Sequence, residues 1–147
     1  MRFESLLHTW MQKPARPQRL KGNNMTDQRV TIGNSDLQVF PLVLGGNTFG
    51  WTSDEKTSRA VLDAYAEAGG NFIDTADVHS AWAPGNAGGE SEILLGRWLA
   101  VHSNRDDMVI ATKVSEHPQY KGLSRDNIIA AANESLLRLG IDTIDLY

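Results

Sequence analysis

Four short apolar segments recur along this 147-residue chain, separated by 30 to 37 residues. Each is predicted to be a buried strand, because its apolar residues follow one another without polar alternation. A connection of this length leaves room for a helix, so successive strands should run parallel with right-handed crossovers. The spacing therefore predicts a repeated βα unit. The segments are marked by Leu42, Phe72, Val109 and Ile144.

Three helices are predicted between these strands. The first follows a capping-box pattern at residues 52–55 and stops before Gly69 and Gly70. The third begins after Ser124 and ends at Gly140. All three carry an apolar stripe at helical spacing, which we expect to face the core. The stripes are Val61, Tyr65 and Ala68 in the first helix, Leu95, Trp98, Leu99 and His102 in the second, and Ile129, Ala132, Leu136 and Leu139 in the third.

A β-hairpin is predicted ahead of the first strand, because alternating stretches at residues 29–32 and 37–40 flank a polar loop at 33–36. The fold class is thus α/β, with a hairpin and about four βα units. Two architectures fit: a small open doubly wound sheet, and the N-terminal part of a (β/α)8 TIM barrel, whose full length is about 250 residues. The loop at residues 45–50 lacks the glycine spacing of a dinucleotide fingerprint, so it gives the open sheet no support.

Charge divides the chain near Met25. Residues 1–24 carry five basic groups and one acidic group, hence +4, whereas residues 25–147 carry nine basic and 17 acidic groups, hence -8. We expect residues 1–24 to be a disordered or spurious extension and residues 25–147 to form the folded domain. An acidic domain is a poor candidate for binding nucleic acid. No apolar run approaches the roughly 20 residues that cross a membrane.

The chain has no cysteine, which excludes disulfides and thiolate chemistry. This composition fits a reducing cytoplasm, where we expect the protein to be located. A metal site is not expected, because His8, His102 and His117 show no ligand spacing.

Polar residues follow three of the predicted strands: Asn47 and Thr48 the first, Asp74 with His79 the second, and Lys113 the third. The carboxyl ends of parallel strands meet at one edge of a sheet, so these side chains should converge. A lysine beside an aspartate forms an ion pair, and its positive charge lowers the pKa of a neighbouring acid. From spacing alone, a structural ion pair and a catalytic pair are equally well supported for Lys113 and Asp74.

Four motifs in order resemble the aldo-keto reductase superfamily, over about residues 29–147. The resemblance implies a (β/α)8 barrel whose bottom is closed by an N-terminal hairpin, and the reduction of aldehydes and ketones with NADPH but without a Rossmann fold. The motifs are N-F-I-D-T-A-D at 71–77, G-E-S-E with L-G at 89–96, A-T-K at 111–113, and L-x-L-G followed by D-x-I-D-L-Y at 137–147.

By this resemblance, Asp74 and Lys113 are two of four catalytic groups. They tune a tyrosine that protonates the carbonyl oxygen, and a histidine orients the carbonyl. The tyrosine position, five residues after Asp74, is His79, and the histidine position lies beyond Tyr147. The resemblance further implies that Asn47, Thr48, Phe49 and Asp74 contact the NADPH cofactor, and that Phe49 and Trp82 contact the small carbonyl substrate.

His79 replaces a phenol of pKa near 10 by a shorter imidazole of pKa near 6.5, which Lys113 should keep neutral. Tyr120 is a second candidate for the acid. We therefore expect a truncated reductase that is weakly active or inactive alone. The alternatives are a non-catalytic accessory subunit that pairs with itself or a complementary half through open sheet edges, and a truncated gene product without function.

Overall fold

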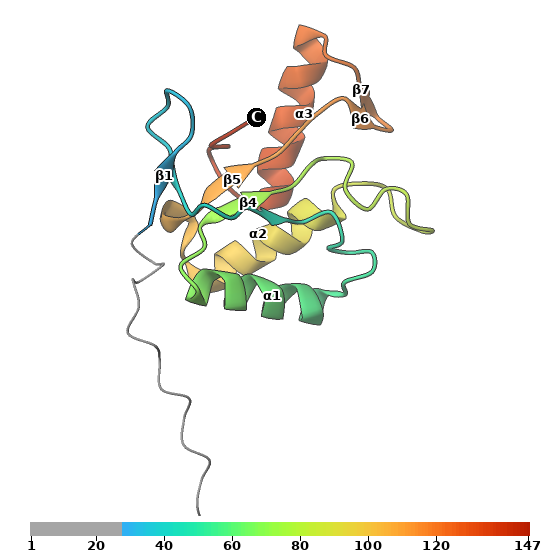
Figure 1. The fold of residues 1–147 in the computed structure, drawn as a ribbon. Coiled ribbons are helices and arrows are strands. Elements are labelled where there is room, and N and C mark those ends of the chain that lie inside the picture. The colour runs from blue at the N-terminus through green and yellow to red at the C-terminus, as the bar shows by residue number, and fades with distance from the viewer. Residues whose placement is uncertain (1–27) are drawn as a thin grey trace, which may run out of the picture.

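The computed structural model describes residues 28–147, so the predicted extension at residues 1–24 lies outside the described residues. The described chain begins with the expected hairpin, in which β1 (Val30–Thr31) pairs antiparallel with β2 (Gln38–Val39) (Figure 1). Asn71 joins the hairpin to the sheet, because its Oδ1 accepts the backbone N–H of Phe40 at 2.8 Å and its Nδ2 donates to the Gln38 carbonyl at 3.1 Å.

Three parallel strands form the central sheet, in the order β3 (Leu44–Gly45), β4 (Phe72–Asp74) and β5 (Val109–Ala111). A fourth position follows β5, where Leu146 forms a single parallel bridge with Ala111. The parallel β-α order predicted from the spacing is confirmed. The first strand begins later than predicted, since Leu42 and Val43 precede β3 and are exposed.

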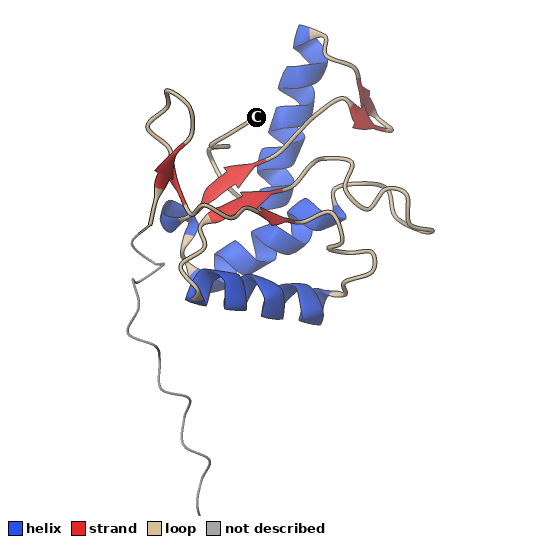
Figure 2. Cartoon of the chain, viewed as in Figure 1, coloured by secondary structure: helices blue, strands red, loops and turns tan. Residues whose placement is uncertain are grey.

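Three helices connect these strands: α1 (Glu55–Glu67), α2 (Glu90–His102) and α3 (Arg125–Leu139) (Figure 2). The Asp54 side chain caps α1 by accepting the Thr57 N–H, and Ser124 caps α3 in the same way through Asn127. Gly140 ends α3 in the left-handed region, at φ +64°. A short 3-10 turn, η2 (Arg105–Asp107), precedes β5.

A second hairpin was not predicted. In it, β6 (Glu116–His117) pairs antiparallel with β7 (Tyr120–Lys121), between β5 and α3. The loop of only two residues and the two-residue strands leave no alternation long enough to recognise in sequence. The Asn127 side chain fixes this hairpin against α3 by donating to the Tyr120 carbonyl at 2.9 Å.

The hydrophobic core lies between the sheet and the helices that cover one of its faces (Figure 1). Ile73 and Ile110 contribute the strand side, and Trp98 is fully buried among the helices. The Trp98 indole donates to Asp63 Oδ1 on α1 at 2.7 Å, so its one polar group is satisfied. The remaining buried members of this core are Phe49, Leu62, Leu94, Leu95, Leu99, Met108 and Leu139.

Two of the predicted apolar stripes are only partly buried. On α1 the buried residues are Ser58 and Leu62, whereas Val61 is 40% exposed. On α3 Leu139 is buried as predicted, whereas Ile129 is 45% exposed. The prediction that these stripes face the core is therefore wrong for Val61, Ala68 and Ile129, because helical periodicity identifies an apolar side but not the neighbour that covers it.

Within residues 28–147, no helix has the length and apolar character needed to span a membrane. In the same part of the chain, no three His, Cys, Asp or Glu side chains gather closely enough to hold a metal ion.

Candidate functional site

Asp74 and Lys113 meet at the carboxyl ends of β4 and β5. The Lys113 ammonium donates to Asp74 Oδ1 at 2.7 Å and to the Thr75 carbonyl at 2.6 Å. The backbone holds both residues in place, because parallel pairing continues beyond the strands through Thr75 N to Ala111 O at 2.8 Å and Asp77 N to Lys113 O at 3.2 Å. The predicted ion pair is thus present, and both side chains remain partly open to solvent.

His79 lies in the turn that follows Asp74, with its backbone N–H bonded to the Ala76 carbonyl at 3.2 Å. Its Nδ1 is buried and has no hydrogen-bond partner among residues 28–147. Burial lowers the pKa of the imidazole most, and the nearby Lys113 charge lowers it further, while Asp74 opposes the shift. His79 is therefore neutral at pH 7. Burial is the larger cause, and the Lys113 charge, on which the prediction rested, is the smaller one.

Tyr120, the other candidate acid, belongs to the β6–β7 hairpin. Its ring packs against His117 with centroids 5.3 Å apart, and its carbonyl binds Asn127 of α3. These contacts tie Tyr120 to a different substructure from the Asp74–Lys113 pair. The charges of Lys113 and Asp74 act on His79, which favours His79 over Tyr120 as the residue beside that pair.

Two exposed tryptophans stand near His79. Trp82 is 48% exposed, and its ring lies 6.2 Å from the His79 ring and 5.6 Å from Trp51, both in edge-to-face geometry. Trp51 was missed by the sequence reasoning, although its place in the same loop as Phe49 could have suggested it. Phe49 itself is only 3% exposed and packs in the core, so its ring does not face solvent at this edge.

Asn47 and Thr48 lie in the loop between β3 and α1. This loop reaches the same edge as Asp74, because Gly45 pairs with Asp74 in the sheet. Gly46 begins a tight turn in which the Phe49 N–H bonds to its carbonyl at 3.1 Å, and a Cβ at Gly46 would come within 2.8 Å of Ser91 Oγ. The loop is thus held close to α2 and leaves Asn47 exposed.

The glycine-rich loop before α2 is not a free anion cradle. The Glu90 carboxylate folds back onto it and accepts the Ala87 N–H at 2.7 Å and the Gly88 N–H at 3.0 Å. Gly88 and Gly89 adopt φ values of +101° and +85°, which favour glycine. The amides that could have bound a phosphate are therefore occupied by a side chain of the same helix.

Asp77 is a buried acid that the sequence reasoning did not single out. It is 1% exposed, and neither carboxyl oxygen has a hydrogen-bond partner among the described residues. Burial, followed by the charge of nearby Glu92, raises the pKa of Asp77 to about 6. Glu92 is itself fully buried but well paired, with Arg138 Nε and Thr112 Oγ1 each 2.6 Å away.

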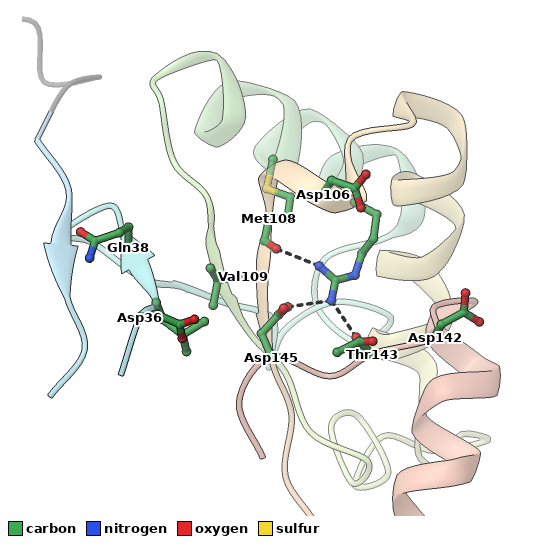
Figure 3. Close-up of a pocket in the computed structure, with 10 residues that line it drawn as sticks. Asp36, Gln38, Asp106, Met108, Val109, Asp142, Thr143 and Asp145 are labelled. Atoms are coloured by element: carbon green, nitrogen blue, oxygen red, sulfur yellow. Dashed lines mark hydrogen bonds and ion pairs between the residues drawn. The ribbon is translucent and has the colours of Figure 1, made fainter. Parts of the chain in front are cut away.

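A cavity of about 530 Å³ lies at the opposite end of the sheet (Figure 3). Arg105 lines it and donates to the Met108 carbonyl at 2.8 Å, the Thr143 carbonyl at 2.6 Å and Asp145 Oδ2 at 2.7 Å. The guanidinium is thus committed to structural bonds at the amino ends of the strands. None of the predicted site residues lines this cavity.

Comparison with known proteins identifies the family. A sequence model of the Aldo/keto reductase family matches residues 41–147, and the chain belongs to that family. An aldo-keto reductase of Bacillus halodurans in its holo form superposes with a TM-score of 0.67 at 32% identity, over 82% of this chain and 39% of that one. The α/β fold predicted from the sequence, the N-terminal part of a TIM barrel, is confirmed.

Two curated relatives differ in length. An uncharacterized 11.2 kDa protein of Pseudescherichia vulneris is 56% identical over 85 residues, which are 57% of this chain and 82% of that protein. The aryl-alcohol dehydrogenase [NADP(+)] of Phanerodontia chrysosporium is 31% identical over 96% of this chain and 39% of its own length. The chain therefore spans well under half the length of the relatives that carry a named activity.

Proposed function

We propose that this chain is the N-terminal part of an oxidoreductase that reduces an aldehyde or a ketone with NADPH, and that it is weakly active or inactive on its own. Residues 25–147 would form the reductase part, and residues 1–24 an extension to it. The observation that carries the proposal is the Lys113–Asp74 pair beside His79, at the carboxyl ends of two neighbouring strands. A relative named as NADP-dependent supports the choice of cofactor.

The residues present fit one side of a nucleotide cofactor. Asn47 is an exposed amide at the sheet edge, and Thr48 and Asp74 lie next to it as further polar groups. When bound, NADPH supplies the hydride. Lys113 and Asp74 would hold the local charge, and the His79 imidazole would offer an N–H to the carbonyl oxygen as negative charge develops there.

The weak activity follows from the protonation state of His79. Burial and the Lys113 charge favour the neutral imidazole, so few molecules carry the extra proton that a general acid must give up. The imidazole is also shorter than a phenol, and a misplacement of about 1 Å can cost about 10²-fold in rate. Both effects act on proton delivery and leave hydride supply unaffected.

NADPH oxidation with a broad panel of aldehydes tests the proposal. We expect turnover far below that of ordinary enzymes, with some cofactor consumption above the level without aldehyde. A turnover of about 1 s⁻¹ or more would contradict the predicted weakness of the isolated chain. No NADPH binding at all, measured by the cofactor's fluorescence, would contradict the cofactor contacts given to Asn47, Thr48 and Asp74.

His79→Tyr examines the assigned role of position 79. A phenol would restore the longer proton donor, so we expect kcat/KM for NADPH oxidation to rise by about tenfold or more. His102→Tyr is the matched control, because His102 lies at the end of α2 against Trp98 and Asp63. Equal rates for the two variants would refute the role given to His79.

A second candidate function is that of a non-catalytic subunit that needs a partner to complete the barrel. The exposed apolar residues beside both edges of the sheet favour it, among them Leu42 at 63% and Leu146 at 40% exposure. In this case the chain would bind its partner without consuming NADPH.

A further inference from the structure

Trp51 and Trp82 come from neighbouring loops at the carboxyl end of the sheet. Trp51 lies in the loop after β3 and Trp82 in the loop after β4, and these two strands pair with each other. The centroids of the two rings are 5.6 Å apart, the interplanar angle is 86°, and both residues are about half exposed. A single exposed ring needs no explanation, but two rings held in contact beside a candidate site point to a function.

The two loops are fixed to each other by hydrogen bonds. The Ser80 hydroxyl donates to the Phe49 carbonyl at 2.7 Å, and Ser80 is fully buried. The Asn86 amide donates to the Gly50 carbonyl at 2.9 Å and to the Ser80 carbonyl at 3.0 Å. These bonds hold the segment before one tryptophan against the segments on both sides of the other. All of them lie within residues 49–86, so the two loops position the pair by themselves.

Ser80 adopts a backbone conformation that serine rarely takes. Its φ is +71°, in the left-handed region that favours glycine. Holding a residue there costs free energy, and such residues cluster at binding and reaction sites, where surrounding contacts keep them in place. Ser80 directly follows His79 and lies two residues before Trp82. Its conformation therefore sets the direction in which these two side chains leave the loop.

Two rings at a right angle form a corner that suits a third flat ring. A ring that stacks on the face of one indole can point its edge at the face of the other, so both contacts have the geometry that aromatic rings prefer. A puckered aliphatic ring of the same size has no flat face to stack and no quadrupole. The corner lies beside the candidate site, because the His79 ring is 6.2 Å from the Trp82 ring.

We propose that Trp51 and Trp82 form a subsite for a planar aromatic ring carried by the carbonyl substrate. The substrate class is then aromatic aldehydes and aryl ketones, in which the carbonyl carbon is bonded directly to the ring. This bond keeps the carbonyl within the short distance that separates Trp82 from His79. The Phe49 ring lies in the core, so Trp51 is the ring that the loop after β3 offers to the substrate. The inference rests on the proposed carbonyl reduction and concerns binding only.

Binding of benzyl alcohol and of cyclohexylmethanol to the full chain tests the subsite, with the NMR signals of the indole N–H groups as the readout, with and without NADPH. Both alcohols carry a hydroxymethyl group on a six-membered ring, which is flat in the first and puckered in the second. We expect benzyl alcohol to shift the Trp51 and Trp82 signals and to bind about two- to tenfold tighter. The Trp98 signal should stay in place, because its indole is buried and bonded to Asp63.

Variants at Trp82 separate the effect of a ring from that of apolar bulk. Trp82→Leu should abolish the preference for benzyl alcohol, whereas Trp82→Phe, which keeps a ring, should retain most of it. Trp51→Leu should act like Trp82→Leu, and circular dichroism establishes that each variant remains folded. Equal binding of the two alcohols to the wild type, or a preference that survives in Trp82→Leu, would overturn the subsite.

These outcomes are distinct from those that test the reductase function. A preference for benzyl alcohol in a chain that neither binds nor oxidises NADPH would support the subsite and count against the proposed reaction. NADPH oxidation with equal kcat/KM for benzaldehyde and cyclohexanecarbaldehyde would support the reaction and overturn the subsite.

Discussion

The two ends of the sheet differ in how fully their polar side chains are hydrogen-bonded. At the amino end, the side chains of Asn71 and Arg105 each bond two backbone groups of neighbouring segments, and Asp145 accepts from the Ile110 N–H and from Arg105. At the carboxyl end, the Lys113–Asp74 pair is partly solvent-exposed, and buried groups of Asp77 and His79 lack partners. Three of the four buried side-chain atoms without a partner in residues 28–147 belong to Asp77 and His79, and Asn104 holds the fourth.

This difference suggests a division of roles, in which the amino end stabilises the fold and the carboxyl end holds the proposed site. Arg105–Asp145 and Lys113–Asp74 are ion pairs of the same length, 2.7 Å. The Arg105 pair also bonds the Met108 and Thr143 carbonyls and the Ile110 N–H, so it fixes backbone. The Lys113 pair bonds one carbonyl and leaves capacity for a ligand. The same kind of contact thus serves the fold at one end and, under the proposed function, would serve a reaction at the other.

The largest expected effect comes from Asn71→Ala, at the amino end. The variant removes bonds to Phe40 N, Gln38 O and Arg29 and leaves the Phe40 N–H buried without a partner. We expect a loss of about 3 kcal/mol in the free energy of unfolding, measured by urea denaturation. Asn34→Ala, in the exposed hairpin loop, should change it by less than about 0.5 kcal/mol. Similar values for both variants would remove the structural role given to the amino end.

A somewhat smaller effect, of opposite sign, is expected for Asp77→Asn at the carboxyl end. The pKa of Asp77 is about 6 in the folded protein against 3.8 for the free group, so the unfolded chain loses its proton first as pH rises. The free energy of unfolding should therefore fall between about pH 4 and pH 6 and stay low above that. Asparagine has no charge to bury, so the variant should be more stable at pH 7 by somewhat less than about 3 kcal/mol, because its buried amide would still lack partners.

Thermal melts of both proteins from pH 4 to pH 8 measure this prediction. The difference between Asp77→Asn and the wild type should shrink as pH falls toward 4. A difference that is constant with pH, or a variant that is less stable at pH 7, would show that the Asp77 carboxylate finds a partner in solution.

The smallest effect on stability is expected for Lys113→Met. The pair is about half exposed on the Lys113 side, and exposed ion pairs contribute at most about 1 kcal/mol. The same variant should abolish any aldehyde-dependent NADPH oxidation, because the site loses the cation that pairs with Asp74. Urea denaturation and the oxidation assay together check the contrast. A loss of stability comparable to that of Asn71→Ala would make Lys113 a structural residue.

Much of this architecture could be predicted from local sequence. The buried strands around Ile73 and Ile110 have too few polar residues to be anything else, and their spacing requires parallel pairing. Asp74 and Lys113 could be placed together because they end neighbouring strands, which needs only the order of the sheet. The caps at Asp54 and Ser124 follow from their side chains and the position of the helices.

What could not be predicted depends on neighbours far along the chain. The sequence shows that Val61 and Ile129 lie on apolar sides of their helices, but only the arrangement of the other elements decides whether those sides are covered. The family resemblance places Phe49 against the substrate, yet after the tight turn at Gly46 its ring lies in the core. The raised pKa of Asp77 likewise has no local signal, since it depends on burial in the folded chain and on the charges of Glu92 and Arg138.

Glu90 affects which ligands could bind at the loop before α2. Its carboxylate is a tethered competitor for the amides of Ala87 and Gly88, present at a high effective concentration. Any phosphate or carboxylate from solution that sought these amides would first have to displace an anion that cannot diffuse away. The Glu90 carboxylate therefore disfavours binding of other anions at the N-terminus of α2.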